Sequence, residues 1–162
     1  MELIRVDRNG AVRVAPLVAD FRVTLKAFKG IQSQPDIASG QEEIIEFLDS
    51  GFPVYAAEED GILAGYIVCR VDGYCLWVEQ IFVREEYRRK GVASLLFRKA
   101  EEIAASMGEE TVYNYVHPNN ETMIRFLRSK GYTVLNLIEI RKPYKDEKTT
   151  TTIQVDHNSF DY

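Results

Sequence analysis

Three consecutive β-prone runs joined by two Asp-Gly dipeptides are the feature of this sequence that most restricts its fold. The runs cover residues 54–58, 63–71 and 75–83 and are rich in β-branched and aromatic side chains. Asp60-Gly61 and Asp72-Gly73 stand between them, and Asp-Gly is typical of two-residue hairpin turns, whose central residues need positive φ angles. Connections this short join only antiparallel neighbours. The sequence therefore predicts an antiparallel three-stranded meander in the middle of the chain.

Helical periodicity precedes the meander. Apolar residues recur at steps of three and four from Val14 to Phe28, which predicts an amphipathic helix. A second helix is expected where Ser39-Gly40-Gln41-Glu42 resembles a capping box, and Gly51 is expected to end it. A loop separates the two helices, and residues 2–6 are expected to form a short strand ahead of them.

Helices and strands alternate after the meander. The β-prone run 149–155 is expected to be a final strand that hairpins back across Pro143-Tyr144-Lys145-Asp146, or else part of a polar tail over 145–162. The order β-α-α-β-β-β-α-β-α-β-β is that of a mixed α+β sheet domain. With no linker or repeat, one domain over 1–162 is expected. The other predicted elements are a helix over 91–107, a strand over 111–116, a helix over 121–130 closed by Gly131, and a strand over 133–140.

The charge balance and the apolar pattern limit the classes of partner. The chain has 25 acidic and 20 basic residues, a net charge of −5, whereas a general nucleic-acid binder shows a basic excess. No apolar run approaches the ~18 residues of a membrane span, and no signal peptide opens the chain. We therefore expect a cytoplasmic protein without nucleic-acid or membrane partners.

Cys69 and Cys75 flank the second turn. In a hairpin with Asp72-Gly73 as its two-residue loop, Cys69 would face Leu76, and the two thiols would lie on opposite faces of the sheet. A three-residue loop would bring both thiols to one face, so the sequence only leans against a disulfide. Both histidines are distant from the cysteines, so there is no metal-ligand spacing and no metal is expected.

The end of the third meander strand has the features of a phosphate site. A basic loop containing Gly91 follows the strand, and a helix begins after it. The first amides of a helix have no intrahelical acceptor and lie at the positive end of its dipole, so such an end binds anions. Residues 84–99 carry six basic and two acidic side chains. The alternative is a solvated helix entrance, since neither GxGxxG nor GxxxxGK[ST] is present.

Two segments of the chain resemble a known family. Arg88-Arg89-Lys90-Gly91-Val92-Ala93 matches the [RQ]xxGx[GA] signature of the GCN5-related N-acetyltransferase (GNAT) superfamily, which lies between that family's fourth strand and third helix. The run from Asn120 to Tyr132 resembles the family segment N-x-x-A-I-x-F-Y-x-x-x-G-F, and Trp77 to Val83 is similar to the fourth strand. The resemblance implies an α+β fold with a mixed, mostly antiparallel central sheet, helices on both faces, and fourth and fifth strands that splay apart.

This resemblance implies an N-acyltransferase that uses an acyl-coenzyme A, usually acetyl-CoA, as donor to a primary amine. In the family the pantetheine arm pairs like an extra strand with the end of the fourth strand, here Ile81, Phe82 and Val83. Asn120 often contacts the cofactor in relatives, and it is equally a natural N-cap for the helix that follows. Backbone amides of the signature hold the pyrophosphate, which here implicates Arg88, Arg89, Lys90, Gly91, Val92, Ala93 and Ser94.

Glu79 is the candidate general base. An ammonium is not nucleophilic, so a base must take its proton, directly or through water. Glu79 and Gln80 are the only polar residues of the run 75–83, and desolvation disfavours the charged form of a carboxylate in an apolar strand. Family members use glutamates near this position, although not universally. The alternative is that Glu79 faces solvent or pairs with an arginine. His117 is an accessory candidate, with a plain loop histidine as the alternative.

Leu127 departs from the family pattern. The family commonly has a tyrosine there, whose phenol protonates the leaving thiolate, and leucine cannot do so. Water or one of the tyrosines is the candidate substitute. The departure motivates a second hypothesis, a CoA-binding sensor or regulatory module with weak or no catalysis. The candidate tyrosines are Tyr87, Tyr113, Tyr115 and Tyr144.

The expected acceptor is an amine of a small molecule or a peptide. Residues 1–60 carry eleven acidic and six basic side chains, and in relatives the first two helices wall the acceptor side. This bias hints at a cationic amine such as a polyamine, a lysine side chain or an aminoglycoside, against the alternative of a solvated acidic surface. Dimers are common in the family, so a homodimer is a further expectation.

Overall fold

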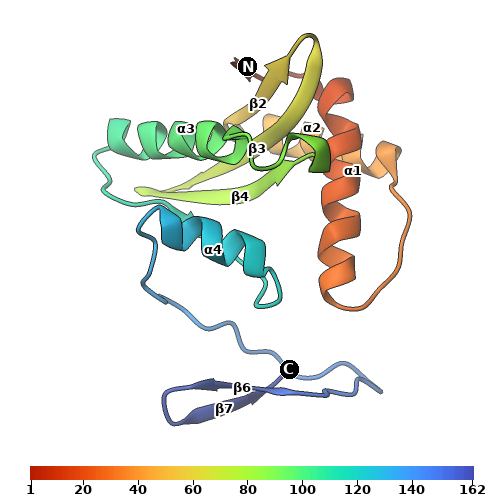
Figure 1. Ribbon diagram of the computed structural model, residues 1–162, viewed down its shortest axis with the longest axis vertical. Coiled ribbons are helices and arrows are strands. Elements are labelled where there is room, and N and C mark those ends of the chain that lie inside the picture. Colours follow the sequence, from red (N-terminus) through yellow and green to blue (C-terminus); the bar gives the residue numbers. More distant parts are fainter. The chain divides into compact units, whose positions relative to one another are not determined.

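A five-stranded sheet organises the first part of the chain (Figure 1). The computed structural model describes residues 1–162, which form two units, Met1–Arg125 and Phe126–Tyr162. The sheet of the first unit has its strands in chain order, antiparallel except for the parallel last pair. This confirms the predicted meander and the mixed, mostly antiparallel sheet. The strands are β1 (Glu2–Arg5), β2 (Val54–Glu59), β3 (Ile62–Asp72), β4 (Cys75–Val83) and β5 (Tyr113–Asn114).

Helices cover both faces of this sheet, as predicted (Figure 1). On one face, α1 (Ala11–Phe28) packs with α2 (Ile37–Asp49) over β2 and β3. On the other face, α3 (Val92–Ser106) contacts β2, β3 and β4, and Lys99 lies over the ring of Tyr55. The short helix η1 (Glu85–Tyr87) precedes α3, and α4 (Glu121–Ser129) follows β5. The core under α1 and α2 includes Val14, Leu17, Val18, Ile44, Val54, Ala56, Tyr66 and Val68.

The two hairpins of the meander differ in their turns. Asp60 and Gly61 form the two-residue loop of the first hairpin, with Glu59 opposite Ile62 and φ angles of 51° and 80° at the turn, as a type I′ turn requires. In the second hairpin Asp72 pairs with Cys75, so the loop is Gly73-Tyr74, and the predicted Asp72-Gly73 loop is wrong. Only Gly73 has a positive φ there, at 60°, which fits a turn of type II′.

The cysteines do not form a disulfide, in line with the prediction. Because the loop is shifted by one residue, Cys69 pairs with Val78 rather than with Leu76. Cys75 faces Asp72, and alternation along β3 places Asp72 and Cys69 on opposite faces of the sheet. Cys69 is fully buried, and burial raises the pKa of its thiol to about 12.

The N-cap of helix α2 lies three residues before the predicted one, Ser39. Asp36 is its N-cap, and the Asp36 carboxylate accepts from the Ser39 backbone amide at 3.0 Å and from the Ser39 hydroxyl at 2.8 Å. These hydrogen bonds lower the pKa of Asp36. The prediction erred because Ser39 is itself a good capping residue, while here it serves as the donor to the true cap.

Helices α1 and α2 approach each other closely at Gly40. A Cβ atom at this position would lie 2.6 Å from the backbone oxygen of Ala15 and 3.1 Å from the amide nitrogen of Ala19. Contacts that short are essentially forbidden, so the absence of a side chain at Gly40 sets the spacing of the two helices. This spacing matters to function, because both helices contribute walls to the cavity described below.

The second unit holds little regular structure. The predicted strand over 133–140 is wrong: these residues form no strand, and several of their apolar side chains are exposed, among them Val134 and Leu135. A β-prone sequence becomes a strand only where a neighbouring backbone supplies hydrogen-bond partners. The predicted final strand exists as β6 (Thr152–Val155), but it pairs with β7 (Asn158–Asp161) and not across Pro143. No helix in the chain has the length and apolar character needed to span a membrane.

Candidate active site

The strands β4 and β5 separate after two residue pairs. Trp77 lies opposite Tyr113 and Val78 opposite Asn114, and the pairing ends there. Residues 80–83 of β4 pair with β3 on one side, but they have no strand on the other. The predicted splay of the fourth and fifth strands is confirmed, and it leaves a strand edge open beside Ile81, Phe82 and Val83, the residues expected to pair with a pantetheine arm.

A β-bulge sits at the point where the strands separate. Val78 pairs with Cys69 and Gln80 with Val68, so the backbone of Glu79 has no pairing partner on β3. Bulges turn side chains away from the ordinary alternation of a strand. The Glu79 side chain lines an open cavity of about 430 Å³. The other lining residues come from α1 and α2: Arg22, Ser39, Glu42, Glu43, Glu46 and Phe47.

Glu79 is paired with an arginine, the alternative that the sequence left open. The Arg70 Nε atom donates to Glu79 Oε2 at 3.0 Å, and a second Arg70 nitrogen donates to Asp72 at 3.0 Å. The hydrogen bond from Arg70 to Glu79 is the main cause that raises the pKa of Arg70. The Arg70 guanidinium also lies 5.4 Å from the centre of the Trp77 ring. Glu79 Oε1 accepts no hydrogen bond, so one oxygen of this cavity-lining carboxylate is not committed to a protein partner.

The acidic lining of this cavity is only partly neutralised. Glu43 is paired with Arg22, and Glu79 with Arg70. Glu42 and Glu46 have no ion pair, and at a spacing of i and i+4 they lie on the same side of α2. The cavity can therefore attract a cation.

The loop from β4 to α3 is shaped to receive an anion. Arg89 and Gly91 have φ angles of 62° and 82°, and Gly91 is the N-cap of α3 with no side-chain cap. The amides of Val92, Ala93 and Ser94 form the first turn of the helix, where no intrahelical acceptor exists. Arg88 Nε donates to the Val83 carbonyl oxygen at 3.1 Å, which fastens the loop to the end of β4.

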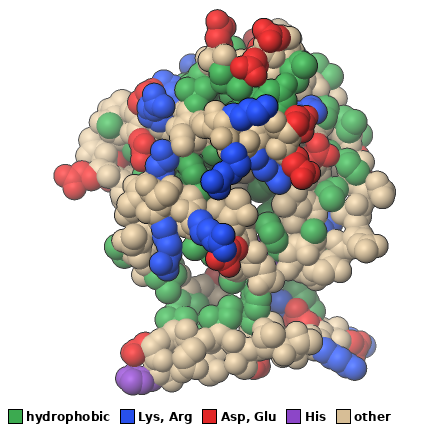
Figure 2. All heavy atoms as spheres, viewed as in Figure 1, with side chains coloured by type: hydrophobic (Ala, Val, Ile, Leu, Met, Phe, Trp, Pro, Cys, Tyr) green, Lys and Arg blue, Asp and Glu red, His purple; other side chains and the backbone are tan.

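Basic side chains surround this helix start. Arg88, Arg89 and Lys90 are exposed, and Figure 2 shows Lys and Arg side chains gathered on the face where, in Figure 1, the loop meets α3. Unpaired amides, a helix dipole and cationic side chains at one place fit a phosphate group. The residues that the sequence predicts for pyrophosphate binding are therefore brought together.

Gly91→Ala is expected to lower the free energy of unfolding by about 1–2 kcal/mol, since alanine is strained at positive φ and Gly91 has a φ of +82°. Chemical denaturation measures the change. Gly91→Asn is the matched control, because asparagine tolerates this region of φ and should lose clearly less. Equal losses for both variants would contradict the assignment of backbone strain.

Asn120 has the capping role that the sequence allowed. Its Oδ1 accepts from the Met123 amide at 3.1 Å at the start of α4. His117 stacks on Phe28 with ring centres 5.6 Å apart, and its Nδ1 accepts from the Asn119 amide. Burial and the nearby Lys29 lower the pKa of His117, so it is neutral at pH 7. His117 does not line the cavity.

The position that departs from the family pattern is buried. Leu127 is 8% exposed on α4 and offers no proton. Among the tyrosines proposed as substitutes, Tyr113 and Tyr115 lie against the Trp77 ring, with centres 4.9 Å and 4.6 Å away. None of the four lines the cavity beside Glu79.

Sequence reasoning missed several residues that shape this site. Arg70 was not identified as the partner of Glu79, and Arg22 and Glu43 were not linked to each other. One signal was available, because Gln80 is a polar residue within an otherwise apolar strand. In the structure Gln80 is buried and hydrogen-bonded to Tyr66 and Glu43.

Solved structures share the fold of this chain. A probable acetyltransferase is 20% identical, with 91% of this chain and 100% of that chain covered and a TM-score of 0.70. PaiA N-acetyltransferase from Thermoplasma acidophilum, in complex with coenzyme A, is 19% identical, with 80% and 87% covered and a TM-score of 0.67. AAC(6')-Iy, in complex with the bisubstrate analog CoA-S-monomethyl-acetylneamine, is 18% identical, with 88% and 98% covered and a TM-score of 0.65.

The family is established by sequence rather than by these distant structures. No curated protein matches the chain. The family model described as Acetyltransferase (GNAT) family matches residues 21–132, which is more than half of the chain and includes both the β4 bulge and the loop from β4 to α3. This chain belongs to the acetyltransferase (GNAT) family.

Proposed function

We propose that this protein is an acyl-CoA-dependent N-acyltransferase that moves an acetyl group from acetyl-CoA to a primary amine. The observation that carries the proposal is the open edge of β4. This edge runs from Val83, where the loop from β4 to α3 begins, back to Glu79 at the cavity of about 430 Å³. We call this loop the anion-binding loop and this cavity the acceptor cavity. A donor with a pyrophosphate at one end and a thioester at the other suits such a path. The coenzyme A bound to PaiA and the bisubstrate analog bound to AAC(6')-Iy support it by analogy.

The donor would contact the two segments already described. Arg88, Arg89, Lys90, Gly91, Val92, Ala93 and Ser94 would bind the pyrophosphate, mainly through unpaired amides and the exposed cations. Ile81, Phe82 and Val83 would pair with the amide groups of the pantetheine arm. Asn120 is occupied as the cap of α4, and we assign it an indirect role, holding the start of that helix.

Glu79 would act as the general base. Its free Oε1 takes a proton from the acceptor ammonium, directly or through water, and the neutral amine then attacks the thioester carbonyl carbon. The nitrogen–carbon bond forms, the carbon–sulfur bond breaks, and the sulfur leaves with its bonding electron pair. The second proton lost by the nitrogen balances the one gained by the thiolate. Since Leu127 provides no acid, we propose that water delivers this proton.

The acceptor is proposed to be a cationic amine with a second positive charge. Four of the seven lining residues are glutamates, and only one is basic. Glu42 and Glu46 have no ion pair, so a second ammonium could satisfy them while the first lies at Glu79. By analogy, the proposal is supported by the aminoglycoside acetyltransferase meta-AAC0020, whose structure is in complex with sisomicin, and by the AAC(6')-Iy complex with CoA-S-monomethyl-acetylneamine.

Replacing Glu42 or Glu46 by Gln should weaken the binding of dications selectively. The KM for 1,4-diaminobutane is expected to rise about two- to fivefold for each change, the size typical of one exposed ion pair. The KM for n-butylamine, which carries one charge, should change less. Steady-state kinetics measure the KM of both amines at low and at high salt. Added salt screens charges, so it should reduce the difference between the two KM changes. The control is Glu110→Gln, an exposed glutamate outside the cavity. Equal shifts for both amines would contradict the role of these carboxylates.

An assay of thiol release tests the proposed function against a sensor role. Acetyl-CoA is mixed with the protein and with 1,4-diaminobutane, n-butylamine or sisomicin, and free thiol is followed while calorimetry measures coenzyme A binding. Amine-dependent release supports the enzyme. Binding of coenzyme A without release by any amine would support the sensor, and neither binding nor release would contradict the proposed donor.

A further inference from the structure

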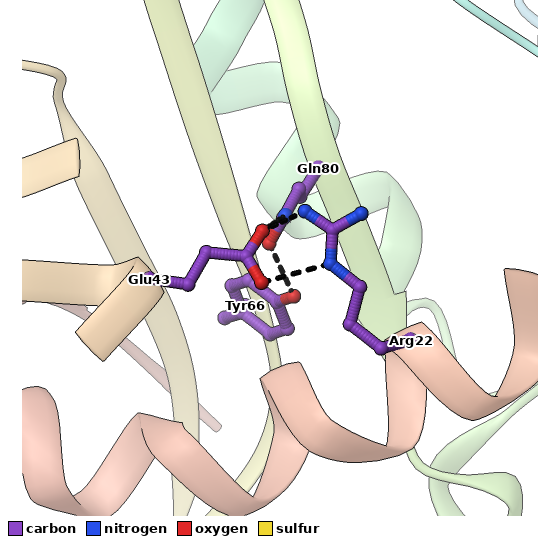
Figure 3. Close-up of polar contacts among 4 residues, drawn as sticks. All are labelled: Arg22, Glu43, Tyr66 and Gln80. Atoms are coloured by element: carbon purple, nitrogen blue, oxygen red, sulfur yellow. Dashed lines mark hydrogen bonds and ion pairs between the residues drawn. The ribbon is translucent and has the colours of Figure 1, made fainter. Parts of the chain in front are cut away.

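The strand that carries Glu79 also carries a buried amide (Figure 3). Gln80 is 3% exposed and is the single polar residue among the buried ones. Burying a carboxamide is unfavourable unless its donors and its acceptor find partners. Gln80 Oε1 accepts from the Tyr66 hydroxyl at 2.7 Å, and Gln80 Nε2 donates to Glu43 Oε1 at 2.5 Å. The amide is thus held from both sides.

The chemistry of the two partners fixes the direction of this amide. A carboxylate only accepts, so the NH₂ group must face Glu43 and the carbonyl oxygen must face Tyr66. Tyr66 is fully buried, and burial raises the pKa of its phenol well above the ordinary value, so the hydroxyl keeps its proton and donates. Arg22 donates to both oxygens of Glu43, from Nε at 2.8 Å and from Nη2. Each polar group therefore has a matched partner.

The network joins four elements, three of which, α1, α2 and β4, line the cavity. Figure 3 shows Arg22 from α1, Glu43 from α2, Tyr66 from β3 and Gln80 from β4 converging on one point. Arg22 and Glu43 also line the cavity itself. The hydrogen-bond network therefore sets the position, relative to β4, of the cavity wall that α1 and α2 form.

Gln80 is the neighbour of the bulged residue Glu79, and this links the hydrogen-bond network to catalysis. Glu79 has no backbone pairing partner on β3, so the ladder does not determine where its side chain points, although Arg70 of β3 donates a hydrogen bond to its carboxylate. Its neighbour Gln80 does pair, with Val68, and is fixed by its side chain as well. Fixing Gln80 constrains the backbone of the bulge and with it the direction of Glu79.

We propose that Gln80 is a positioning residue, which through its hydrogen bonds to Tyr66 and Glu43 holds the β4 bulge so that Glu79 faces the acceptor cavity. The proposal rests on the proposed role of Glu79 as general base. A shift of about 1 Å in a reacting group can cost about 100-fold in rate. A positioning defect should therefore appear in kcat and leave donor binding alone.

Gln80→Leu removes both hydrogen bonds at nearly constant volume. With 1,4-diaminobutane as acceptor, kcat is expected to fall about 10- to 100-fold, while the KM for acetyl-CoA stays within about twofold. Tyr66→Phe removes one hydrogen bond and should lose about threefold in kcat. Thermal unfolding of each variant sets an assay temperature at which all are folded.

Exchanging the carboxylate of Glu43 and the amide of Gln80 gives a sharper test. Gln80→Glu places a second carboxylate against Glu43, and Glu43→Gln turns an amide NH₂ toward Arg22. The double variant Glu43→Gln/Gln80→Glu restores one carboxylate and one amide in reverse order, so that Tyr66 again meets an acceptor and Arg22 Nε keeps the amide oxygen, while Arg22 Nη2 faces the NH₂ group. Each single variant should lose about tenfold or more in kcat, and the double variant should recover part of that loss, because the contact between positions 43 and 80 is again a donor against an acceptor. Normal kcat in folded single variants, or no recovery in the double variant, would overturn the proposal.

Two further measurements separate this proposal from the base assignment. If Glu79→Gln loses kcat and Gln80→Leu does not, the base stands and the positioning role is overturned. If Glu79→Gln keeps kcat, the base assignment fails and the positioning role fails with it. A crystal structure of Gln80→Leu reads the geometry without turnover. Glu79 turned out of the cavity supports the proposal, and Glu79 unmoved overturns it.

Discussion

Glu79→Gln is expected to lower kcat about 100-fold or more, the range that a general base contributes, which corresponds to about 2.7 kcal/mol of barrier. Glutamine has nearly the same shape but cannot take a proton. The partly exposed pair with Arg70 is 3.0 Å long, and pairs of this kind contribute about 0–1 kcal/mol to stability. The variant should therefore fold normally and keep the KM for acetyl-CoA. Steady-state kinetics across pH, with 1,4-diaminobutane as acceptor, measure the effect.

The control for this prediction is Glu110→Gln, which removes the same charge from an exposed position away from the cavity. It should match the unaltered protein in rate and in pH profile. If Glu79→Gln showed an unchanged rate and an unchanged pH profile, Glu79 would not be the base, and another group would have to accept the ammonium proton.

Gly40→Ala is expected to have the largest effect on stability. The added Cβ would stand 2.6 Å from the Ala15 oxygen, which is backbone and cannot move aside cheaply. Overpacking of this kind costs about 1–3 kcal/mol, and for a chain of 162 residues it should lower Tm by about 3–10 °C. Calorimetry measures the shift. Because α1 and α2 wall the acceptor cavity, the KM for the amine should rise as well.

The matched control is Gln41→Ala, the next residue of α2, which adds no atom at the contact between the helices. Alanine is a good helix former, so this variant should be within about 0.5 kcal/mol of the unaltered protein. A stable Gly40→Ala protein would show that the two helices can separate freely, and it would contradict the fixed wall on which the acceptor proposal depends.

Local signals predicted most of the first unit. The β4 run and the glycine at the start of α3 each gave an element within about one residue of the observed bounds, and the helical periodicity from Val14 gave α1, which begins three residues earlier at Ala11. These features depend on neighbours in the sequence. The second turn was misplaced by one residue because two adjacent pairs, Asp72-Gly73 and Gly73-Tyr74, can both supply the glycine that the turn needs.

Long-range partners could not be predicted in the same way. The 133–140 run has the composition of a strand, but composition does not say whether another backbone lies beside it. The bulge that turns Glu79 toward the cavity depends on how β3 and β4 align, and Arg70 reaches Glu79 only in that alignment. The Arg22–Glu43–Gln80–Tyr66 network joins four elements, and no spacing in the sequence points to it.

We propose that this protein transfers an acetyl group from acetyl-CoA to the nitrogen of a cationic amine. Mass spectrometry of 1,4-diaminobutane incubated with acetyl-CoA and the protein tests it most directly, with n-butylamine in a parallel reaction. We predict a product heavier by one acetyl group, formed faster from the diamine than from the monoamine, and formed far more slowly by Glu79→Gln. If the diamine remained unmodified while acetyl-CoA was bound, the protein would not catalyse the proposed acetyl transfer.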